Sequence, residues 1–142
     1  MIFVVEIRKY VKLLTDGPDM NKINVYLMAA FYFLAGVYHF YNPFFYLKII
    51  PLWLGNIEFL VAISGFIEII LGLALLSEQT RKISCWLIMC MLTVFLILVH
   101  IPMVIAYYDT GDSYLWLAVL RLPVQAVLVW WAWRISTAKR FR

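Results

Sequence analysis

Hydrophobic residues gather in four long runs that are separated by short polar or basic segments. Each run holds about the 20 residues that a helix needs to cross roughly 30 Å of hydrocarbon. Runs joined by loops this short cannot form a membrane barrel, whose strands alternate polar and apolar residues. We therefore predict an all-α fold, a bundle of four transmembrane helices at residues 23–41, 57–76, 83–106 and 114–135.

The basic residues lie on one side of this predicted bundle. Lys and Arg occur before the first run, in the turn at residues 78–82 and in the tail after the fourth run, whereas the loop at residues 107–113 carries two Asp residues and no base. Cytoplasmic loops are enriched in Lys and Arg. We therefore expect both termini in the cytoplasm and the loops at residues 42–56 and 107–113 on the outer side.

The two ends of the chain are predicted to flank a single membrane domain. Residues 1–14 place apolar side chains opposite basic ones at helical spacing, which indicates a short interfacial amphipathic helix. Met20 is an alternative start, and residues 1–19 would then be no part of the native protein. We divide the chain into a basic segment at residues 1–22, a four-helix domain at residues 23–135 and a basic cytoplasmic tail at residues 136–142.

Composition agrees with a membrane protein. The chain of 142 residues is 65% hydrophobic, well above the roughly 45–50% that is typical of soluble domains. Its net charge of +4 comes from bases beside the apolar runs, where topology and anionic lipid explain them, so we expect no nucleic-acid partner. Cys85 and Cys90 point about 140° apart on a helix and cannot bridge one another.

Five ionisable side chains fall within the predicted spans. A charge there costs at least about 2.5 kcal/mol, so each residue is a candidate for a functional site. At about 1.5 Å per residue, all five lie between the outer surface and the midplane of the bilayer, on four separate helices. Their common depth indicates one shared site, formed by His39, Glu58, Glu68, His100 and Arg121.

Arg121 keeps its charge and therefore needs a carboxylate, of which Glu68 is the deepest. We predict a Glu68–Arg121 pair, with Gln125 one turn further along supplying additional hydrogen bonds. Glu68 shares a helix face with Gly65 and Gly72, and small residues of this kind let a neighbouring helix approach closely. Two interpretations stay open: the polar residues lock the bundle together, or they bind a ligand or carry protons or electrons.

Simpler roles also fit individual residues. His39 lies near the predicted interface, where it can be hydrated, and Glu58 at a helix start can favour the positive end of the helix dipole. The sequence contains no metal-ligand spacing, no Gly-rich phosphate loop and no nucleophile motif. We predict no metal site.

Four segments together resemble the DoxX-like family of small bacterial membrane proteins: LAGVYHFYNP at 34–43, FYLKIIP at 45–51, SGFIEIILG at 64–72 and LRLPVQ at 120–125. The resemblance covers about residues 23–133 and implies a four-helix bundle in the bacterial cytoplasmic (inner) membrane. It implies that the family-motif positions are His39, Asn42, Pro43, Glu68, Arg121, Pro123 and Gln125. Where relatives often have Pro-Ala-Asn, this chain has Leu98-Val-His100, which puts the role of that Asn in doubt here.

The resemblance connects the chain with several functions. Some members of the family are linked with redox enzymes such as thiosulfate:quinone oxidoreductase, others with oxidative-stress complexes, and distant relatives act as chaperones or cargo receptors. Our leading hypothesis from the sequence is a multi-pass protein that binds a small lipophilic ligand such as quinone in a redox or stress-response context. The expected ligand-binding residues are His39, Glu58, Glu68, His100, Arg121 and Gln125.

A rival hypothesis needs no ligand. The chain would then be a non-enzymatic accessory or assembly subunit of a larger membrane complex, or part of a homo-oligomer, with the buried polar residues serving only the fold. Since no cofactor motif is present, an accessory or non-catalytic subunit is favoured over a self-contained enzyme. A small transporter or proton channel is a third class, which four helices without repeats would form only as an oligomer.

Overall fold

The computed structural model describes residues 22–47, 50 and 52–138. The predicted interfacial helix at residues 1–14, the question of a start at Met20 and the end of the tail beyond residue 138 lie outside these described residues. Within them the secondary structure is helical and contains no strand, as predicted. The elements are α2 (Lys22–Tyr41), α3 (Pro43–Leu47), η1 (Leu52–Leu54), α4 (Ile57–Ala74), α5 (Arg81–Phe95), η2 (Leu96–His100), α6 (Ile101–Thr110) and α7 (Leu115–Thr137).

Four helical stretches are long and apolar enough to cross a membrane, which confirms the predicted number of spans. They are α2, α4, the continuous stretch Arg81–Thr110 formed by α5, η2 and α6, and α7. Their ends agree with the predicted boundaries to within four residues. Most of their large apolar side chains are exposed, as expected of helices whose outer faces contact lipid.

Helices α2 and α4 form a close pair because glycines remove the side chains between them. A Cβ atom on Gly36 would lie 2.5 Å from the Gly65 carbonyl oxygen, and one on Gly72 would lie 2.9 Å from the Ala29 carbonyl oxygen. Both distances are too short for a real Cβ, so the two backbones are in direct contact. The predicted inward face of α4 is confirmed, since Gly65, Glu68 and Gly72 are all buried.

The third span contains a π-helical segment, η2, between α5 and α6. The amide of Ile101 donates to the Leu96 carbonyl, five residues back, and Pro102 follows immediately. Proline has no amide hydrogen and cannot continue the regular hydrogen-bond ladder. A widened turn of this kind is an expected response, and such turns occur frequently at functional sites.

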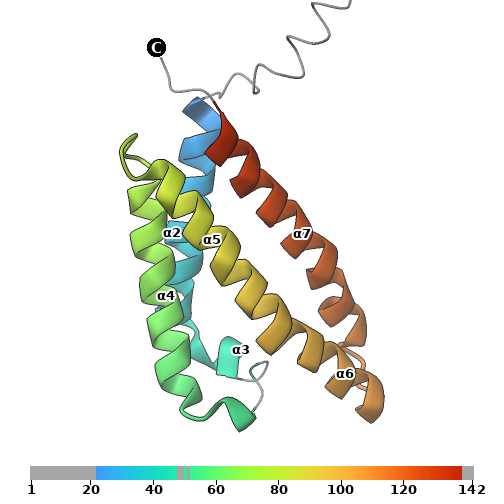
Figure 1. Ribbon diagram of the computed structural model, residues 1–142. Coiled ribbons are helices and arrows are strands. Elements are labelled where there is room, and N and C mark those ends of the chain that lie inside the picture. The colour runs from blue at the N-terminus through green and yellow to red at the C-terminus, as the bar shows by residue number, and fades with distance from the viewer. Residues whose placement is uncertain (1–21, 48–49, 51, 139–142) are drawn as a thin grey trace, which may run out of the picture.

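Both ends of the described chain lie at the same end of the bundle. The start of α2, the turn between α4 and α5 and the end of α7 meet there, whereas α3 and the turn between α6 and α7 lie at the opposite end (Figure 1). Lys22 begins α2, Arg81 and Lys82 begin α5 and Arg134 lies in the last turn of α7, so these described bases share one end. Arg81 is buried at that end and donates from Nε to the Leu75 carbonyl and from Nη2 to the Leu76 carbonyl, satisfying the end of α4.

The helices converge at the basic end and spread apart toward the other (Figure 1). The buried apolar core accordingly occupies the convergent half. It consists of side chains from α2, the end of α4, the first part of α5 and the end of α7: Val25, Met28, Ala29, Tyr32, Leu71, Leu75, Cys85, Ile88, Met89, Leu92, Ala132 and Ile135. In the other half the α2–α4 pair separates from α5, η2 and α7.

Candidate functional site

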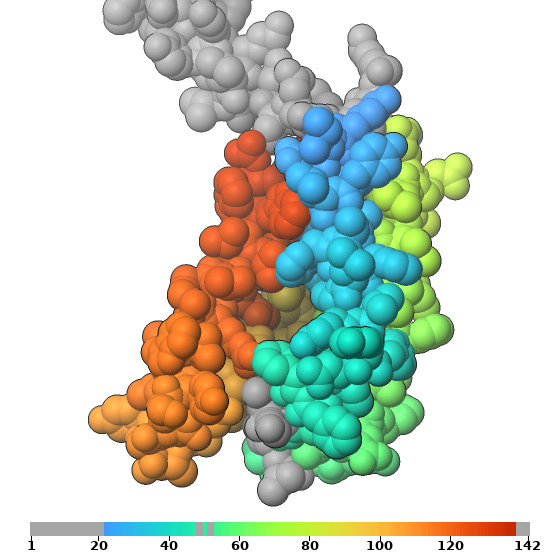
Figure 2. Space-filling model, turned by 180° about the vertical axis from the view of Figure 1, so that it is seen from behind, coloured from blue at the N-terminus to red at the C-terminus, as the bar shows by residue number. Residues whose placement is uncertain are grey.

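A cavity of about 580 Å³ lies between the α2–α4 pair on one side and α5, η2 and α7 on the other. Seen from behind, the surface is hollowed between α2 and α7, and atoms of α5 are visible at the bottom of the hollow (Figure 2). Aliphatic and aromatic side chains make up most of the lining. Four of the predicted site residues line the same cavity, namely His39, Glu68, His100 and Gln125.

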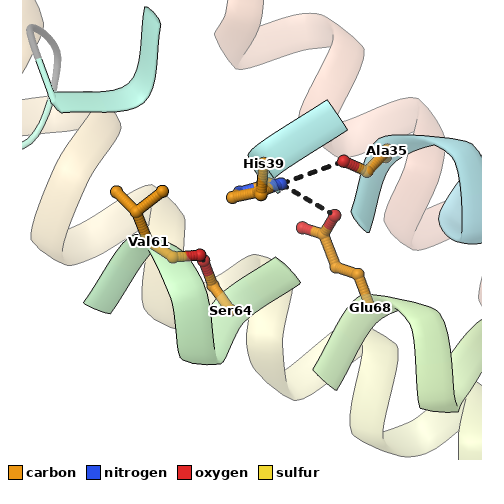
Figure 3. Close-up of polar contacts among 5 residues, drawn as sticks. All are labelled: Ala35, His39, Val61, Ser64 and Glu68. Carbon is orange, nitrogen blue, oxygen red and sulfur yellow. Dashed lines mark hydrogen bonds and ion pairs between the residues drawn. The ribbon is translucent and has the colours of Figure 1, made fainter. Parts of the chain in front are cut away.

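His39 and Glu68 face one another on the wall formed by α2 and α4 (Figure 3). His39 Nδ1 donates a hydrogen bond to the Ala35 carbonyl oxygen at 2.9 Å, and the Glu68 Oε2 atom lies 3.6 Å from the same nitrogen. Because a carbonyl oxygen only accepts hydrogen bonds, Nδ1 carries a proton. The contact with Glu68 is electrostatic and too long for a hydrogen bond, so the carboxylate keeps hydrogen-bonding capacity for another partner.

The short helix α3, which lies in the connection between α2 and α4, packs against His39. The ring of Tyr46 stacks on the imidazole of His39, with 3.6 Å between the ring centroids. Burial, and secondarily the negative charge of Glu68, raise the pKa of the Tyr46 phenol to about 12. The Tyr46 phenol therefore stays neutral, and its ring forms part of the aromatic lining of the cavity.

Three buried polar atoms have no hydrogen-bond partner among the described residues. They are the Tyr32 hydroxyl, Glu68 Oε2 and His100 Nδ1, and all three residues line the cavity. A buried polar group without a partner costs about 1–3 kcal/mol, so such groups are rare in native proteins. The gathering of three such atoms around one cavity makes this cavity the candidate functional site.

The wall opposite the α2–α4 pair carries His100 and Gln125. His100 ends η2, and the widened turn brings Leu98, Val99 and His100 to the cavity together. The Gln125 side-chain amide is buried and donates to the Leu92 carbonyl of α5, which fixes the amide against the cavity. Gln125 was predicted to supply hydrogen bonds to a Glu68–Arg121 pair. That prediction is wrong, because the Gln125 amide donates to the backbone of α5 instead.

The predicted Glu68–Arg121 pair is wrong. Glu68 contacts His39, and Arg121 instead donates from Nη1 to the sulfur of Met103 at 3.4 Å and lies over the ring of Phe45, 5.4 Å from its centroid. An aromatic face stabilises a guanidinium through its quadrupole without a formal negative charge. Arg121 does not line the cavity and joins α7 to α3 and α6 at the wider end of the bundle.

Glu58 also lies apart from the cavity. It is exposed in the first turn of α4, where Asn56 caps the helix by accepting a hydrogen bond from the Phe59 amide. An acidic residue in that position favours the positive end of the helix dipole, which agrees with the simpler role considered for it. The shared site therefore contains four of the six predicted residues.

Sequence reasoning did not select Tyr32, Phe45 or Pro102 as site residues. Tyr32 precedes His39 by seven residues and so lies on the same helix face, which was the available signal for it. Pro102, two residues after His100, was the signal for an irregular turn in the third span. No sequence signal pairs Phe45 with Arg121, because that contact depends on how α3 folds back.

Four apolar helices that fit a bilayer by length and composition define a multi-pass membrane protein, and its cavity joins apolar walls to buried polar atoms. The chain belongs to the family described as a domain of unknown function (DUF8561), whose profile matches residues 28–136, about three quarters of its length. No curated protein and no solved structure matches the chain. Within the described residues, no three His, Cys, Asp or Glu side chains gather to hold a metal ion.

Proposed function

We propose that this protein binds a small lipophilic molecule with polar oxygens, such as a quinone, in the cavity between its two helix pairs. The binding residues are His39, Glu68, His100 and Gln125. The protein acts in a membrane redox or stress-response context in the bacterial inner membrane, with both termini in the cytoplasm. The DoxX-like motifs and the positive-inside pattern of the sequence support this setting.

The observation that carries the proposal is the set of unpartnered polar atoms in an otherwise apolar cavity. A volume of about 580 Å³ lies within the range of small-molecule sites, which typically join apolar walls to a few placed polar groups. Water alone is a poor occupant of mostly apolar cavities. An amphiphilic ligand suits such a cavity, because its oxygens can hydrogen-bond with the unpartnered polar atoms and its hydrocarbon part can pack against the apolar walls.

Thermal unfolding in detergent tests binding, and the chain supplies its own reporter. Cys85 is fully buried, whereas Cys90 is exposed, and the sequence holds no other cysteine. In a Cys90→Ala background, a thiol-reactive fluorophore therefore reports unfolding through Cys85. A quinone with a decyl tail, such as decyl-1,4-benzoquinone, is expected to raise the melting temperature as its concentration rises, following RT ln(1 + [L]/Kd).

Glu68→Gln and Glu58→Gln make a matched pair of variants. Both replace a carboxyl group on α4 with an amide, but only Glu68 lines the cavity. We expect Glu68→Gln to reduce the quinone-dependent shift and Glu58→Gln to retain it. If wild-type protein shows no shift at any quinone concentration, the proposed function is wrong. Equal shifts in both variants would mean that quinone binds elsewhere or partitions into the detergent.

A second candidate function is an accessory or assembly subunit of a larger membrane complex. It is favoured by the open side of the bundle, where the surface is hollowed between α2 and α7 (Figure 2). Cross-linking of native membranes from a photoreactive group at Val127, an exposed position on α7, tests this candidate. Capture of one defined membrane protein, together with no quinone response, would put the accessory function first.

A further inference from the structure

We propose that the cavity recognises a ring that carries oxygen atoms at two opposite positions, and that Tyr32 is one of its specificity-determining residues. This inference rests on the proposed function and narrows the ligand class. It separates ligands with two polar ends from lipophilic molecules with a single polar group, such as long-chain alcohols, phenols or fatty acids. The unpartnered polar atoms on the two walls of the cavity carry the argument.

One wall holds the Tyr32 hydroxyl and Glu68 Oε2. Tyr32 is 2% exposed and Glu68 is 7% exposed, and neither atom has a hydrogen-bond partner among the described residues. Tyr32 from α2 and Glu68 from α4 line the same cavity. The Tyr32 hydroxyl can donate to a ligand carbonyl, whereas Glu68 Oε2 can accept from a ligand hydroxyl, so this wall can bind an oxygen-bearing group in its carbonyl or its hydroxyl form.

The other wall holds His100 Nδ1, which is also buried and without a partner in the described part of the chain. His100 comes from η2, and η2 and Glu68 belong to the two separate sides of the cavity. A ligand with one polar end can hydrogen-bond with the polar atoms of one wall only, and leaves the polar atoms of the other wall without a partner. Because each unpaired buried group keeps its full desolvation cost, a ligand with a polar atom at both ends is favoured.

Aromatic side chains support a ring between these walls. Tyr46 stacks on His39 beside Glu68, and Phe31 and Phe95 line the cavity from α2 and α5. Aromatic groups pack on a flat ring by offset stacking or edge-to-face contact, with centroids about 4.5–7 Å apart. The cavity thus joins aromatic sides to polar groups at two walls, which is the arrangement that a 1,4-dioxygenated ring requires.

The test compares three probes that share one decyl tail: decyl-1,4-benzoquinone, 4-decylphenol and decylbenzene. Dissociation constants are obtained from concentration series of thermal unfolding in the Cys90→Ala background. We expect the two-oxygen ring to bind wild type at least about tenfold more tightly than the one-oxygen ring, since one hydrogen bond to a buried group is worth about that factor. Decylbenzene has no polar atom, so its effect on the melting temperature measures apolar binding without hydrogen bonds.

Tyr32→Phe removes one hydroxyl and keeps the ring, and His100→Phe removes the polar atom of the opposite wall. Each variant is expected to lower the preference for the quinone over the phenol toward onefold, while the apo melting temperature of Tyr32→Phe stays near that of wild type. Equal binding of quinone and phenol by wild type would overturn this inference and leave the proposed function standing. No binding of any polar probe beyond decylbenzene would overturn both.

Discussion

Replacing Gly65 with alanine adds one methyl group at the closest contact between α2 and α4. The new Cβ would lie 2.6 Å from His39 Cβ and 2.9 Å from the Gly36 carbonyl oxygen. Ordinary van der Waals contact begins at 3.4 Å, so the helices must separate by about 0.8 Å at this point. Neither neighbour can rotate away, because one is a Cβ and the other belongs to the backbone.

The energetic cost follows from that separation. A gap of about 0.5–1 Å forfeits roughly a quarter to a half of the dispersion energy of the atoms that lose contact. Overpacking of this kind costs about 1–3 kcal/mol, and the better helix propensity of alanine returns up to about 1 kcal/mol. We expect a net destabilisation of about 1–2 kcal/mol for Gly65→Ala. For a chain of this size the melting temperature should fall by roughly 4–8 °C.

Gly72→Ala is the matched control for this substitution. Its new Cβ would lie 2.9 Å from the Ala29 carbonyl oxygen and from the Phe33 amide nitrogen, so it also pushes α2 and α4 apart. The contact is about 10 Å along the helix from Gly65 and involves no cavity side chain named above. Both variants should melt earlier, but only Gly65→Ala displaces His39 and should also weaken the stabilisation by quinone.

Thermal unfolding with Cys85 as the reporter measures both effects in one experiment. A melting temperature of Gly65→Ala within about 1 °C of the parent would refute the close backbone contact. Equal loss of the quinone response in Gly65→Ala and Gly72→Ala would refute the specific link between this contact and the position of His39. Retention of the quinone response in both variants would show that the contact between α2 and α4 does not affect the binding site.

The contacts of the ionisable residues predict how substitutions combine. His39→Asn and Glu68→Gln should be non-additive by about 0.5–3 kcal/mol in a double-mutant cycle, because the two side chains share one contact. The cycle of Glu68→Gln with Arg121→Gln should give the smaller coupling, and an equal or larger value would contradict the pairing described above. Orientation is tested in a cysteine-free background: a membrane-impermeant maleimide should label Ser113→Cys in intact cells and Ser77→Cys only after lysis, and the reverse pattern would invert the topology.

The spans and their inward faces could be predicted because both follow from local rules. Run length gives the number of helices, and the 100° step between residues places Tyr32, Gly36 and His39 on one face, which is buried as predicted. The regular 100° step between residues is interrupted in the third span by the π-helical segment η2. A regular 100° step would place Thr93 and His100 on a common face, but the π turn adds a residue, so Thr93 is exposed while His100 lines the cavity.

The partner of Arg121 could not be predicted from formal charges. A guanidinium within a span was expected to need a carboxylate, whereas Arg121 has an aromatic face and a thioether as its partners. The contact with Phe45 requires α3, five residues that form a helix within residues 42–56, a segment that was predicted as an outer loop without a helix. Glu68 was correctly expected to be buried, but its partner His39 lies on the helix that the glycines bring closest.

The division of the bundle into two hairpins orders the events of its biogenesis. The first hairpin, α2 with α4, can complete its backbone contacts once these two spans are in the membrane, before α5 joins them there. The second, α5 through α7, makes its own contacts independently, including the bond from Gln125 to Leu92. The cavity exists only after the two hairpins meet. Lipids that fill the space between the hairpins would have to leave at that step, so the cleft proposed to bind a ligand would first be a site of lipid exchange during assembly.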